Sequence, residues 1–387
     1  MALAQRAAEI LARLVAFDTT SHGSNLALIE WVEGYLADLG VASRRIGGDE
    51  PGKANLLATV GPAVAGGVVL SGHTDVVPVT GQAWTSDPFT LTERDGRLYG
   101  RGSADMKAFL ALALAATPDF QAAPLKRPAH LAFSYDEEIG CFGAPHMIAV
   151  IARELPRPSL VVVGEPTLMR PVTGHKGILY GEVIVRGHEA HSAQTHLGAS
   201  AVMAALPILS VLGDLAARLE AAADPASPFT PKGATLTIGR LEGGTAGNIL
   251  ARECRFIFDL RCAAGADPRA LIEPVAKAVE AADAGLAARF ADAGASLRIL
   301  ADVPPLAPEA DGAAEAFVRR LTGDNGPAGA VSYAAEAGQF QHAGYSTVIC
   351  GPGSIDQAHQ PDEYIDVAQI EAGAAFMQRL CEALSAD

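Results

Sequence analysis

The first 175 residues alternate between stretches with the hydrophobic spacing of a helix and short runs that are apolar throughout. Short apolar runs separated by helices are typical of a mostly parallel sheet that is covered by helices on both faces. We therefore predict an α/β fold for this part of the chain. The predicted strands are 54–60, 67–71, 131–134 and 160–163, and the predicted helices are one at the start, 25–39, 107–116 and 141–154.

From about Lys176 the predicted strands and helices become longer and their order changes. The pattern predicts strand, helix, strand, strand, helix and strand, which is the ferredoxin-like arrangement of an α+β domain. The corresponding ranges are 177–185, 199–222, 234–241, 248–261, 268–291 and 296–301.

The tail after residue 304 contains a helix, an apolar strand at 346–350 and a closing amphipathic helix, which is too little for a separate domain. We expect the tail to complete the first sheet. The predicted plan is a discontinuous α/β domain of residues 1–175 and 305–387, with a mixed, mostly parallel sheet. An α+β domain of residues 176–304 interrupts it.

The chain is acidic, with a formal net charge of −15. Residues 176–304 carry 12 positive and 14 negative side chains, so almost all of the acidity lies in the discontinuous domain. Nucleic acids and anionic membranes bind to basic surfaces, and we therefore expect neither as a partner. With 49% hydrophobic residues, the chain can bury a large core, which argues against intrinsic disorder.

Targeting signals and cysteine chemistry are not indicated. No apolar stretch is expected to reach the roughly 20 residues that span a bilayer. The start of the chain lacks the charged head, apolar middle and cleavage pattern of a signal peptide. Five scattered cysteines without a CxxC pair argue against a disulfide framework and a cysteine zinc site. We therefore expect a cytoplasmic protein.

Histidines and acids follow several of the predicted strands. His73 and Asp75 come after the strand at 67–71, and a carboxylate beside an imidazole can orient a metal-ligating histidine. Three consecutive acids at 136–138 follow the next strand, where their mutual repulsion is reasonable if a cation neutralises one of them. Taken singly, each of these motifs could equally be a solvated polar turn.

Three further segments contribute candidate ligands. Asp105 lies in the glycine-rich turn 100–107, whose spacing fits neither common phosphate-binding loop, so we do not expect nucleotide binding. Glu165 follows the strand at 160–163, and His359 lies in a rigid turn near the end of the chain. Reactive groups gather at the carboxyl ends of parallel strands, and we expect these side chains to converge there.

Two histidines and three carboxylates form a nitrogen and oxygen ligand set without a thiolate. Such a set suits zinc, or cobalt or manganese. Five ligands exceed the usual three of one catalytic zinc. If one carboxylate is shared, they supply two sites of three ligands each, which is the arrangement of two-metal hydrolases.

The motifs at 73–75, 104–107, 136–138, 164–167 and His359 resemble, in order and context, the dizinc amidohydrolase family. That family includes acetylornithine deacetylase, succinyl-diaminopimelate desuccinylase, aminoacylases and glutamate-type carboxypeptidases, and the resemblance covers nearly the whole chain. It implies a zinc-peptidase-like catalytic domain that binds two divalent metal ions, interrupted by a ferredoxin-like lid and dimerisation domain. It also implies a homodimer.

The resemblance assigns a role to each motif residue. Asp105 would bridge two metals, His73 and Glu165 would complete one site, and Glu138 and His359 would complete the other. Glu137 would be the general base, Asp75 would orient His73, and the peptide bond between Asp105 and Met106 would be cis.

Residues of the inserted domain and one late loop would contact the substrate. The resemblance implies that His191 stabilises the oxyanion in the partner subunit's site, with His188 as the ambiguous alternative. Asn248 and Arg261 look like substrate contacts, and an arginine suits a bidentate grip on a carboxylate, although it could be an ordinary surface residue. We hypothesise that Glu336 selects the cationic or polar end of the substrate; an ordinary surface acid is the alternative.

The resemblance therefore implies a metal-dependent hydrolase that cleaves the amide bond of an N-acyl amino acid. Residues 174–177 and 351–364 look most like acetylornithine deacetylases, which implies N2-acetyl-L-ornithine as the substrate and a role in arginine biosynthesis. The alternatives are succinyl-diaminopimelate, acetylcitrulline, a broad range of N-acyl amino acids or a dipeptide. A non-catalytic metal-binding or scaffold protein of the same fold also stays open.

Overall fold

The computed structural model describes residues 2–48 and 50–386, which form two compact units. Unit 1 comprises the described residues up to Gly174, Leu306–Ala330, and the described residues from Ala335 onward. Unit 2 comprises His175–Pro305 and Val331–Ala334. The short segment Val331–Ala334, which the sequence-based division gave to the discontinuous domain, thus lies with unit 2. The outer limits of that division, residues 1 and 387, lie outside the described residues.

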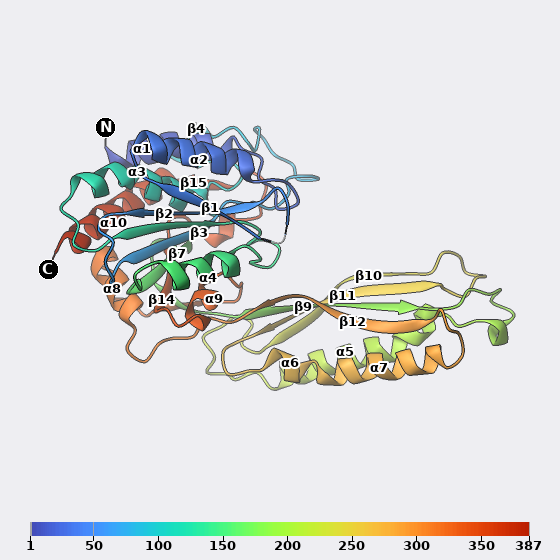
Figure 1. Cartoon of the computed structure of the whole chain (residues 1–387). Coiled ribbons are helices and arrows are strands. Elements are labelled where there is room, and N and C mark those ends of the chain that lie inside the picture. Colours follow the sequence, from blue (N-terminus) through green and yellow to red (C-terminus); the bar gives the residue numbers. More distant parts are fainter. Residues whose placement is uncertain (1, 49, 387) are drawn as a thin grey trace. The chain divides into compact units, whose positions relative to one another are not determined.

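The main sheet of unit 1 has the strand order β1-β2-β6-β3-β7-β14-β8-β13 (Figure 1). Strands β6, β3, β7 and β14 are mutually parallel, whereas β1, β2 and β8 pair antiparallel with their neighbours. A smaller sheet has the order β15-β5-β4. The bounds are β1 Ser43–Gly47, β2 Ala54–Val60, β3 Val68–His73, β4 Thr92–Arg94, β5 Arg97–Tyr99, β6 Ala129–Ser134, β7 Leu160–Pro166, β8 Val172–His175, β13 Gly329–Val331, β14 Thr347–Gly351 and β15 Tyr364–Asp366.

Helices cover both faces of the main sheet, with α1, α2, α3 and α10 on one side and α4 and α9 on the other (Figure 1). Helix α3 is rich in alanine and leucine, which favour helices, and it is apolar all round because it lies within the core. The bounds are α1 Leu3–Val15, α2 Leu26–Asp38, α3 Lys107–Ala122, α4 Ala144–Glu154, α8 Ala313–Thr322, α9 Ala337–His342 and α10 Val367–Ser385.

Unit 2 is an antiparallel sheet of order β10-β11-β9-β12 with helices α5 and α7 packed against it. Buried and more exposed residues alternate along β11, as expected of a strand with one covered face. The bounds are β9 Gly177–Arg186, α5 Ala201–Ala221, β10 Thr235–Gly243, β11 Glu253–Cys262, α6 Pro268–Leu271, α7 Glu273–Ala287 and β12 Gly294–Val303. The element order and the mixed α/β sheet of unit 1 confirm the predicted fold class.

Two predicted elements of unit 2 were wrong in detail. The strand predicted from residue 248 begins only at Glu253, so Asn248 lies in the preceding loop. The helix predicted over 268–291 divides at Ile272 into α6 and α7, with Pro274 in the first turn of α7, where a proline needs no hydrogen-bond partner.

Helix α5 corrects the expectation that no apolar stretch is long enough to cross a membrane. By length and composition alone it qualifies, with a mean hydropathy of 1.7 over its best window. Its buried residues, among them Ala205, Ile208 and Leu212, belong to the hydrophobic core of unit 2. The opposite side leaves Met203 and Leu206 exposed.

Candidate active site

Neighbouring parallel strands of unit 1 carry the candidate ligands at their carboxyl ends. Strand β3 ends at His73, β7 contains Glu165 near its end, and the acids at 136–138 follow β6 closely. Because β6, β3 and β7 lie side by side and run parallel, these ends meet at one edge of the sheet. Asp105 arrives just before α3, and His359 follows the short 3-10 turn Ile355–Gln357.

Asp105 lies between the two histidines. Its Oδ1 is 3.1 Å from Nε2 of His73, and its Oδ2 is 3.5 Å from Nε2 of His359. The same His73 nitrogen is 3.9 Å from Oε1 of Glu165, whereas the His359 nitrogen is 3.0 Å from Oε2 of Glu138. These five residues therefore divide into two groups of three that share Asp105. The peptide bond between Asp105 and Met106 is cis, as the resemblance implies.

Glu137 borders these ligand groups. A carboxylate oxygen of Glu137 and one of Glu165 lie within 4.8 Å of a His73 ring nitrogen and of each other. The Cys141 thiol lies 3.4 Å from Oε1 of Glu137. The carboxylate of Glu137 is thus close to the candidate ligands, where a proton carrier would be needed.

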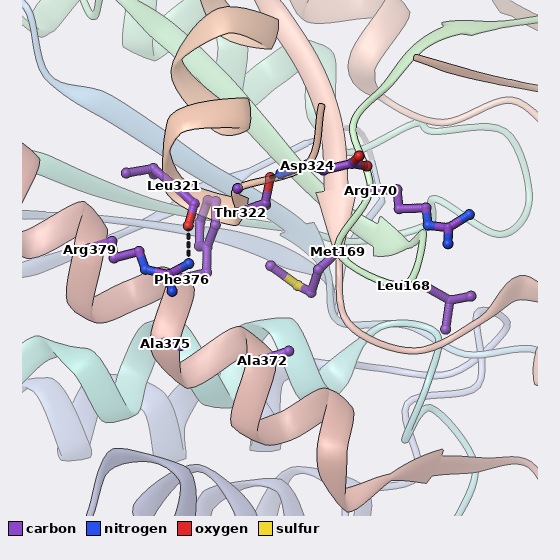
Figure 2. A pocket seen from close by; sticks show the side chains of 11 residues that line it. Leu168, Met169, Arg170, Leu321, Thr322, Asp324, Ala372, Ala375, Phe376 and Arg379 are labelled. Atoms are coloured by element: carbon purple, nitrogen blue, oxygen red, sulfur yellow. Dashed lines mark hydrogen bonds between the residues drawn. The ribbon is translucent and has the colours of Figure 1, made fainter. Parts of the chain in front are cut away.

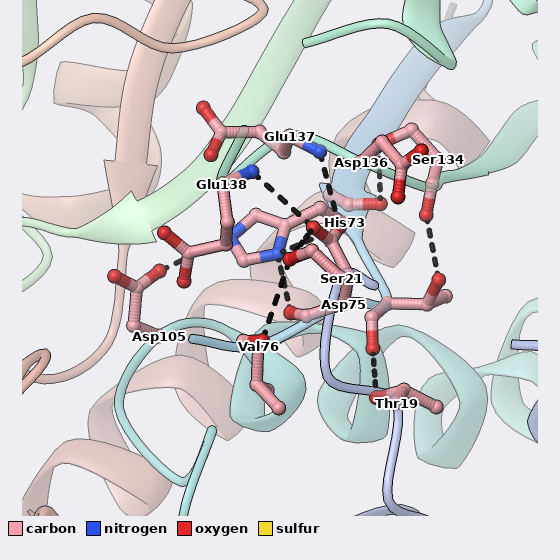
Figure 3. A network of polar contacts seen from close by, with 12 residues as sticks. Thr19, Ser21, His73, Asp75, Val76, Asp105, Ser134, Asp136, Glu137 and Glu138 are labelled. Carbon is pink, nitrogen blue, oxygen red and sulfur yellow. Dashed lines mark hydrogen bonds and ion pairs between the residues drawn. The ribbon is translucent and has the colours of Figure 1, made fainter. Parts of the chain in front are cut away.

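Asp75 holds both His73 and the acidic loop (Figure 3). The main-chain oxygen of Asp75 is 2.9 Å from Nδ1 of His73, and its carboxylate Oδ1 is 3.6 Å away. A carbonyl oxygen only accepts, so Nδ1 carries a proton. Nε2, at 3.1 Å from Oδ1 of Asp105, is the ring atom that can serve as a metal ligand once it has lost its proton. The carboxylate accepts the main-chain N–H groups of Glu137 and Glu138, at 3.1 and 3.2 Å, and the Ser21 hydroxyl at 2.7 Å.

The first acid of the loop, Asp136, has a different partner. Its two carboxylate oxygens accept hydrogen bonds from the buried Lys53 ammonium at 2.7 and 2.6 Å. Burial raises the pKa of Asp136 to about 6, although Lys53 opposes the rise. Sequence reasoning missed Lys53, because nothing in its local pattern indicates a buried partner for a distant acid.

The crowded carboxylates have strongly perturbed pKa values. Burial raises the pKa of Glu138 to about 7, and the charge of Asp105 adds to the rise. Burial also raises the pKa of Glu165 well above its usual range, again with a contribution from Asp105. For His73, burial lowers the pKa, but the surrounding carboxylates outweigh it and raise the value well above the usual range.

The chemistry of this donor set fits divalent cations. Glu165 Oε1 is buried and has no hydrogen-bond partner among the described residues. Asp105 and Glu165 are only 6% and 4% exposed, and buried carboxylates need a compensating positive charge. Imidazole nitrogens and carboxylate oxygens are ligands for zinc and neighbouring metals.

The candidate residues of unit 2 lie at two ends of its sheet. The main-chain oxygen of Asn248 accepts the Ser192 N–H at 3.0 Å, so Asn248 adjoins the loop of His191. Arg261 pairs in register with Ile178 at the start of β9, whereas the loop of Asn248 precedes the start of β11, which pairs with Arg186 at the end of β9. At a rise of about 3.3 Å per residue, these two ends are about 26 Å apart.

The two histidines of the 188–191 segment have different surroundings. The His188 ring stacks on Phe290, with centroids 4.4 Å apart, and its Nδ1 is 2.9 Å from an Asp292 carboxylate oxygen. His191 is exposed, and its Nδ1 accepts the Ala193 N–H at 3.1 Å. Because Nδ1 accepts, Nε2 of a neutral His191 carries the proton and can donate it in a hydrogen bond.

Glu336 is not on the surface. It is fully buried, and its Oε1 accepts the hydroxyl of Ser71 at 2.5 Å. This burial argues against the hypothesis that Glu336 touches and selects a substrate. The flanking residues Ala335 and Ala337, both buried, are the sequence signal that could have indicated a core position.

A cavity of about 480 Å³ in unit 1 lies apart from the candidate ligands (Figure 2). None of the predicted site residues lines it, so the candidate active site is not in this cavity. Its described lining comes from the segment after β7, from the end of α8 with the two residues that follow it, and from the middle of α10: Leu168, Met169, Arg170, Leu321, Thr322, Gly323, Asp324, Ala372, Ala375, Phe376 and Arg379.

Comparison with known proteins gives a consistent result. Residues 69–383 match the model of the peptidase family M20/M25/M40. The chain is 35% identical to the acetylornithine deacetylase of Proteus mirabilis over 369 residues, covering 95% of this chain and 92% of that protein.

Solved structures have the same fold. A family M20 metallo-carboxypeptidase from Sulfolobus solfataricus superposes with a TM-score of 0.76 at 18% identity, covering 98% of this chain and 99% of the other. The YXEP protein of Bacillus subtilis, a dinuclear metal binding peptidase from family M20, superposes with a TM-score of 0.66 at 17% identity. That match covers 99% of this chain and 98% of the other.

Proposed function

The chain belongs to the peptidase family M20/M25/M40 and is a metal-dependent amidohydrolase, and we propose that it converts N2-acetyl-L-ornithine and water to L-ornithine and acetate. The observation that carries the proposal is the position of Asp105 between two histidines, one facing each of its carboxylate oxygens. The similarity to acetylornithine deacetylase supports the substrate. The proposal includes a cytoplasmic enzyme of arginine biosynthesis, with neither nucleic acid nor membrane as partner.

We propose that two divalent cations, zinc or else cobalt or manganese, bind to the two ligand groups. His73, Asp105 and Glu165 would hold one cation, and Asp105, Glu138 and His359 the other. When bound, such ions polarise the acyl carbonyl and make water more acidic. The dinuclear metal binding of the YXEP protein supports this part of the proposal.

Glu137 supplies the proton transfers in this proposal. Its carboxylate borders the ligands, takes the proton of the attacking water and delivers it to the nitrogen of the leaving amine. Asp75 keeps Glu137 in place by accepting its main-chain N–H. The proton on Nδ1 of His73 is held by the Asp75 carbonyl oxygen, which keeps Nε2 available as a ligand atom.

The substrate contacts of unit 2 support a homodimer. We propose that Arg261 grips the substrate carboxylate and that Asn248 and His191 contact its acyl end. Arg261 and the other two residues lie about 26 Å apart, which is too far for one amino acid to span. A second copy of the chain would supply His191 and Asn248, and His191 would donate from Nε2 to the oxyanion.

Exposed apolar side chains on unit 2 also support self-association. Met203 and Leu206 of α5 are 65% and 49% exposed, and Leu241 on the edge strand β10 is 55% exposed. Helix α5 and strand β10 are in contact, and a contiguous apolar surface across them would be typical of a protein interaction site.

The experiment that tests the proposed function is a substrate panel with and without metal. Dialysis against a chelator should abolish hydrolysis, and Zn²⁺ should restore it; full activity of metal-free protein would contradict the metal mechanism. Among N2-acetylornithine, acetylcitrulline and succinyl-diaminopimelate, we expect the highest kcat/KM for N2-acetylornithine. A higher kcat/KM for another compound of the panel would change the proposed substrate but leave the proposed type of reaction unchanged. Zinc binding without hydrolysis of any N-acyl amino acid would favour the scaffold alternative.

A further inference from the structure

A buried ion pair lies next to the candidate ligands without belonging to them. Arg101, four residues before Asp105, and Glu363, four residues after His359, form it. Nη1 of Arg101 is 2.8 Å from Oε2 of Glu363, and each side chain is only 1% exposed. The Glu363 carboxylate also accepts the main-chain N–H groups of Gly102, Ala104 and Asp105 at 2.9, 2.8 and 3.0 Å.

The segment that carries His359 is held from several sides. The side-chain amide of Gln82 donates to the main-chain oxygen of His359 at 2.9 Å, and Gln82 in turn accepts a hydrogen bond from Arg101. The Asp362 carboxylate accepts the N–H and the hydroxyl of Thr85 at 2.8 and 2.9 Å. The segment is therefore joined both to residues 82–85 and to the loop that carries Asp105.

This dense bonding coincides with an unfavourable backbone conformation. His359 and Asp362 have φ angles of +63° and +54°, in the left-handed region that non-glycine residues rarely adopt. Such a conformation persists where the surrounding structure determines it, as it often does at functional sites. The contacts that hold these two residues include the bond from Gln82 to the His359 carbonyl and the two bonds from Thr85 to the Asp362 carboxylate.

We propose that Arg101 and Glu363 are positioning residues that fix the spacing between Asp105 and His359. One carboxylate holds the backbone of Asp105, and its own segment carries His359, so the two ligands cannot separate while the ion pair is intact. A buried ion pair often stabilises a fold no more than apolar side chains of similar size would. A role in fixing the positions of Asp105 and His359 therefore explains the presence of this pair better than stability does. The inference rests on the proposed function, because it assumes that these ligands bind a cation.

The two ligand groups are unequal in this respect. His73 and Glu165 lie on the buried central strands β3 and β7, which pair with each other in the main sheet and do not contain either member of the ion pair. His359 lies in a loop, and its position depends on the ion pair. Loss of the Glu363 charge should therefore weaken the group of Asp105, Glu138 and His359 more than the group around His73, which loses only the anchoring of the shared Asp105.

The test is a calorimetric titration of metal-free protein with Zn²⁺ alone. For wild type we expect two binding events. Glu363→Gln, which puts an amide donor against main-chain N–H groups, should weaken one event by roughly 10- to 100-fold and the other event clearly less. The visible spectrum of the Co²⁺ protein should change most for the same event. Thermal unfolding of the metal-free variants shows whether each is folded.

The matched control is Asp366→Asn. Asp366 pairs with Arg97 at 3.1 Å across strands β15 and β5, which adjoin Glu363 and Arg101 in the chain, but the side chains are 49% and 43% exposed. It should leave both events unchanged. If Glu363→Gln does not fold, Gln82→Met tests the inference instead. This substitution removes the hydrogen bond to the His359 carbonyl without leaving a buried charge unpaired. We expect it to weaken one Zn²⁺ binding event several-fold.

Three outcomes overturn the inference. Wild-type affinity for both ions in folded Glu363→Gln would do so, as would equal weakening of both events. If Glu363→Gln fails to fold, an unchanged titration of Gln82→Met has the same meaning. In these cases the two events of wild type leave the proposed function intact. A wild-type protein that binds no Zn²⁺ would contradict the proposed function itself and, with it, this inference.

Discussion

The two units bury their sheets in different ways. The difference suits unit 1 to holding the catalytic residues and unit 2 to contacting other molecules. In unit 1, strands β3 and β7 are buried at every residue. The candidate ligands lie at or just beyond the carboxyl ends of these strands. In unit 2, β11 buries every second residue, and the sheet keeps one polar face and an exposed edge. We expect unit 1 to determine the reaction and unit 2 to determine what is recognised.

The largest expected effect is in unit 1. Glu137→Gln removes the proposed proton carrier and keeps its size, so kcat should fall by about 10³-fold, within the usual range for a general base. Zinc content, measured by mass spectrometry, should stay at the wild-type value because Glu137 is not a proposed ligand. Glu93→Gln on the exposed strand β4 is the control. Robust turnover by Glu137→Gln would remove its assignment.

The next effect tests unit 2. His191→Ala should lower kcat by roughly 10²-fold, as loss of an oxyanion donor does, without changing zinc content. Mixing this variant with Glu137→Gln should restore part of the activity, since a hybrid dimer contains one intact site. His196→Ala, at another exposed histidine of the same loop, is the control. Failure to recover activity despite demonstrated subunit exchange would contradict a shared site.

A third prediction compares the stability of the units at low pH. Burial lowers the pKa of His130 in β6 of unit 1 to about 4, and likewise that of His175, the last residue of β8 and the first residue of unit 2. The pKa of each histidine in the folded protein lies below its value of about 6.5 in the unfolded chain. The contribution of the neutral histidine to the free energy of unfolding is therefore complete above about pH 6.5 and is lost as the pH falls toward 4.

At pH 5 each histidine should lower the free energy of unfolding by about 2 kcal/mol relative to neutral pH. His130→Asn should therefore flatten the pH dependence of amide hydrogen exchange in β6, and His175→Asn the one in β9. If either variant changed the pH dependence of exchange equally in β6 and β9, the two units would unfold together. Their stabilities at low pH would then not be separate.

The smallest effects come from a pair of glycines. A Cβ at Gly164 would overlap the Phe109 ring, and one at Gly181 would overlap the Phe258 ring. Each alanine variant should lose roughly 1–3 kcal/mol of unfolding free energy by overpacking. Only Gly164→Ala should also weaken Zn²⁺ binding, since Gly164 precedes Glu165.

Calorimetry and urea unfolding measure both quantities. Gly213→Ala, in α5 with nothing within 4 Å of the new methyl group, is the control and should stabilise by roughly 0.5–1 kcal/mol. Equal losses of zinc affinity in Gly164→Ala and Gly181→Ala would show that unit 2 also shapes the metal site.

The sequence predicted those parts of the site that depend on local pattern. His73 and Glu165 come at the ends of apolar runs, and buried parallel strands bring the residues at their carboxyl ends to one edge of the sheet. The partners of these residues were not predictable in the same way. Lys53, Arg101 and Glu363 lie on segments whose local pattern is that of ordinary loops, and only the tertiary fold brings them to Asp136 and Asp105.

Burial was the other limit of sequence reasoning. Glu336 was interpreted as a surface or substrate-facing acid because charged residues are rarely buried, yet it is fully buried. Composition also misled for α5, whose apolar residues include both core positions such as Ile208 and exposed ones such as Met203. A one-dimensional pattern records that a side chain is apolar but not which neighbour covers it.

The interrupted connectivity of unit 1 has a consequence for synthesis on the ribosome. Strand β14 pairs with β7 and β8, although all of unit 2's strands are translated before it. The strands of unit 2 are consecutive, so that unit can fold while the central sheet still lacks β14. We expect His359 to be the last candidate ligand to arrive, and the nascent enzyme to have a finished recognition module before it can capture its second ion.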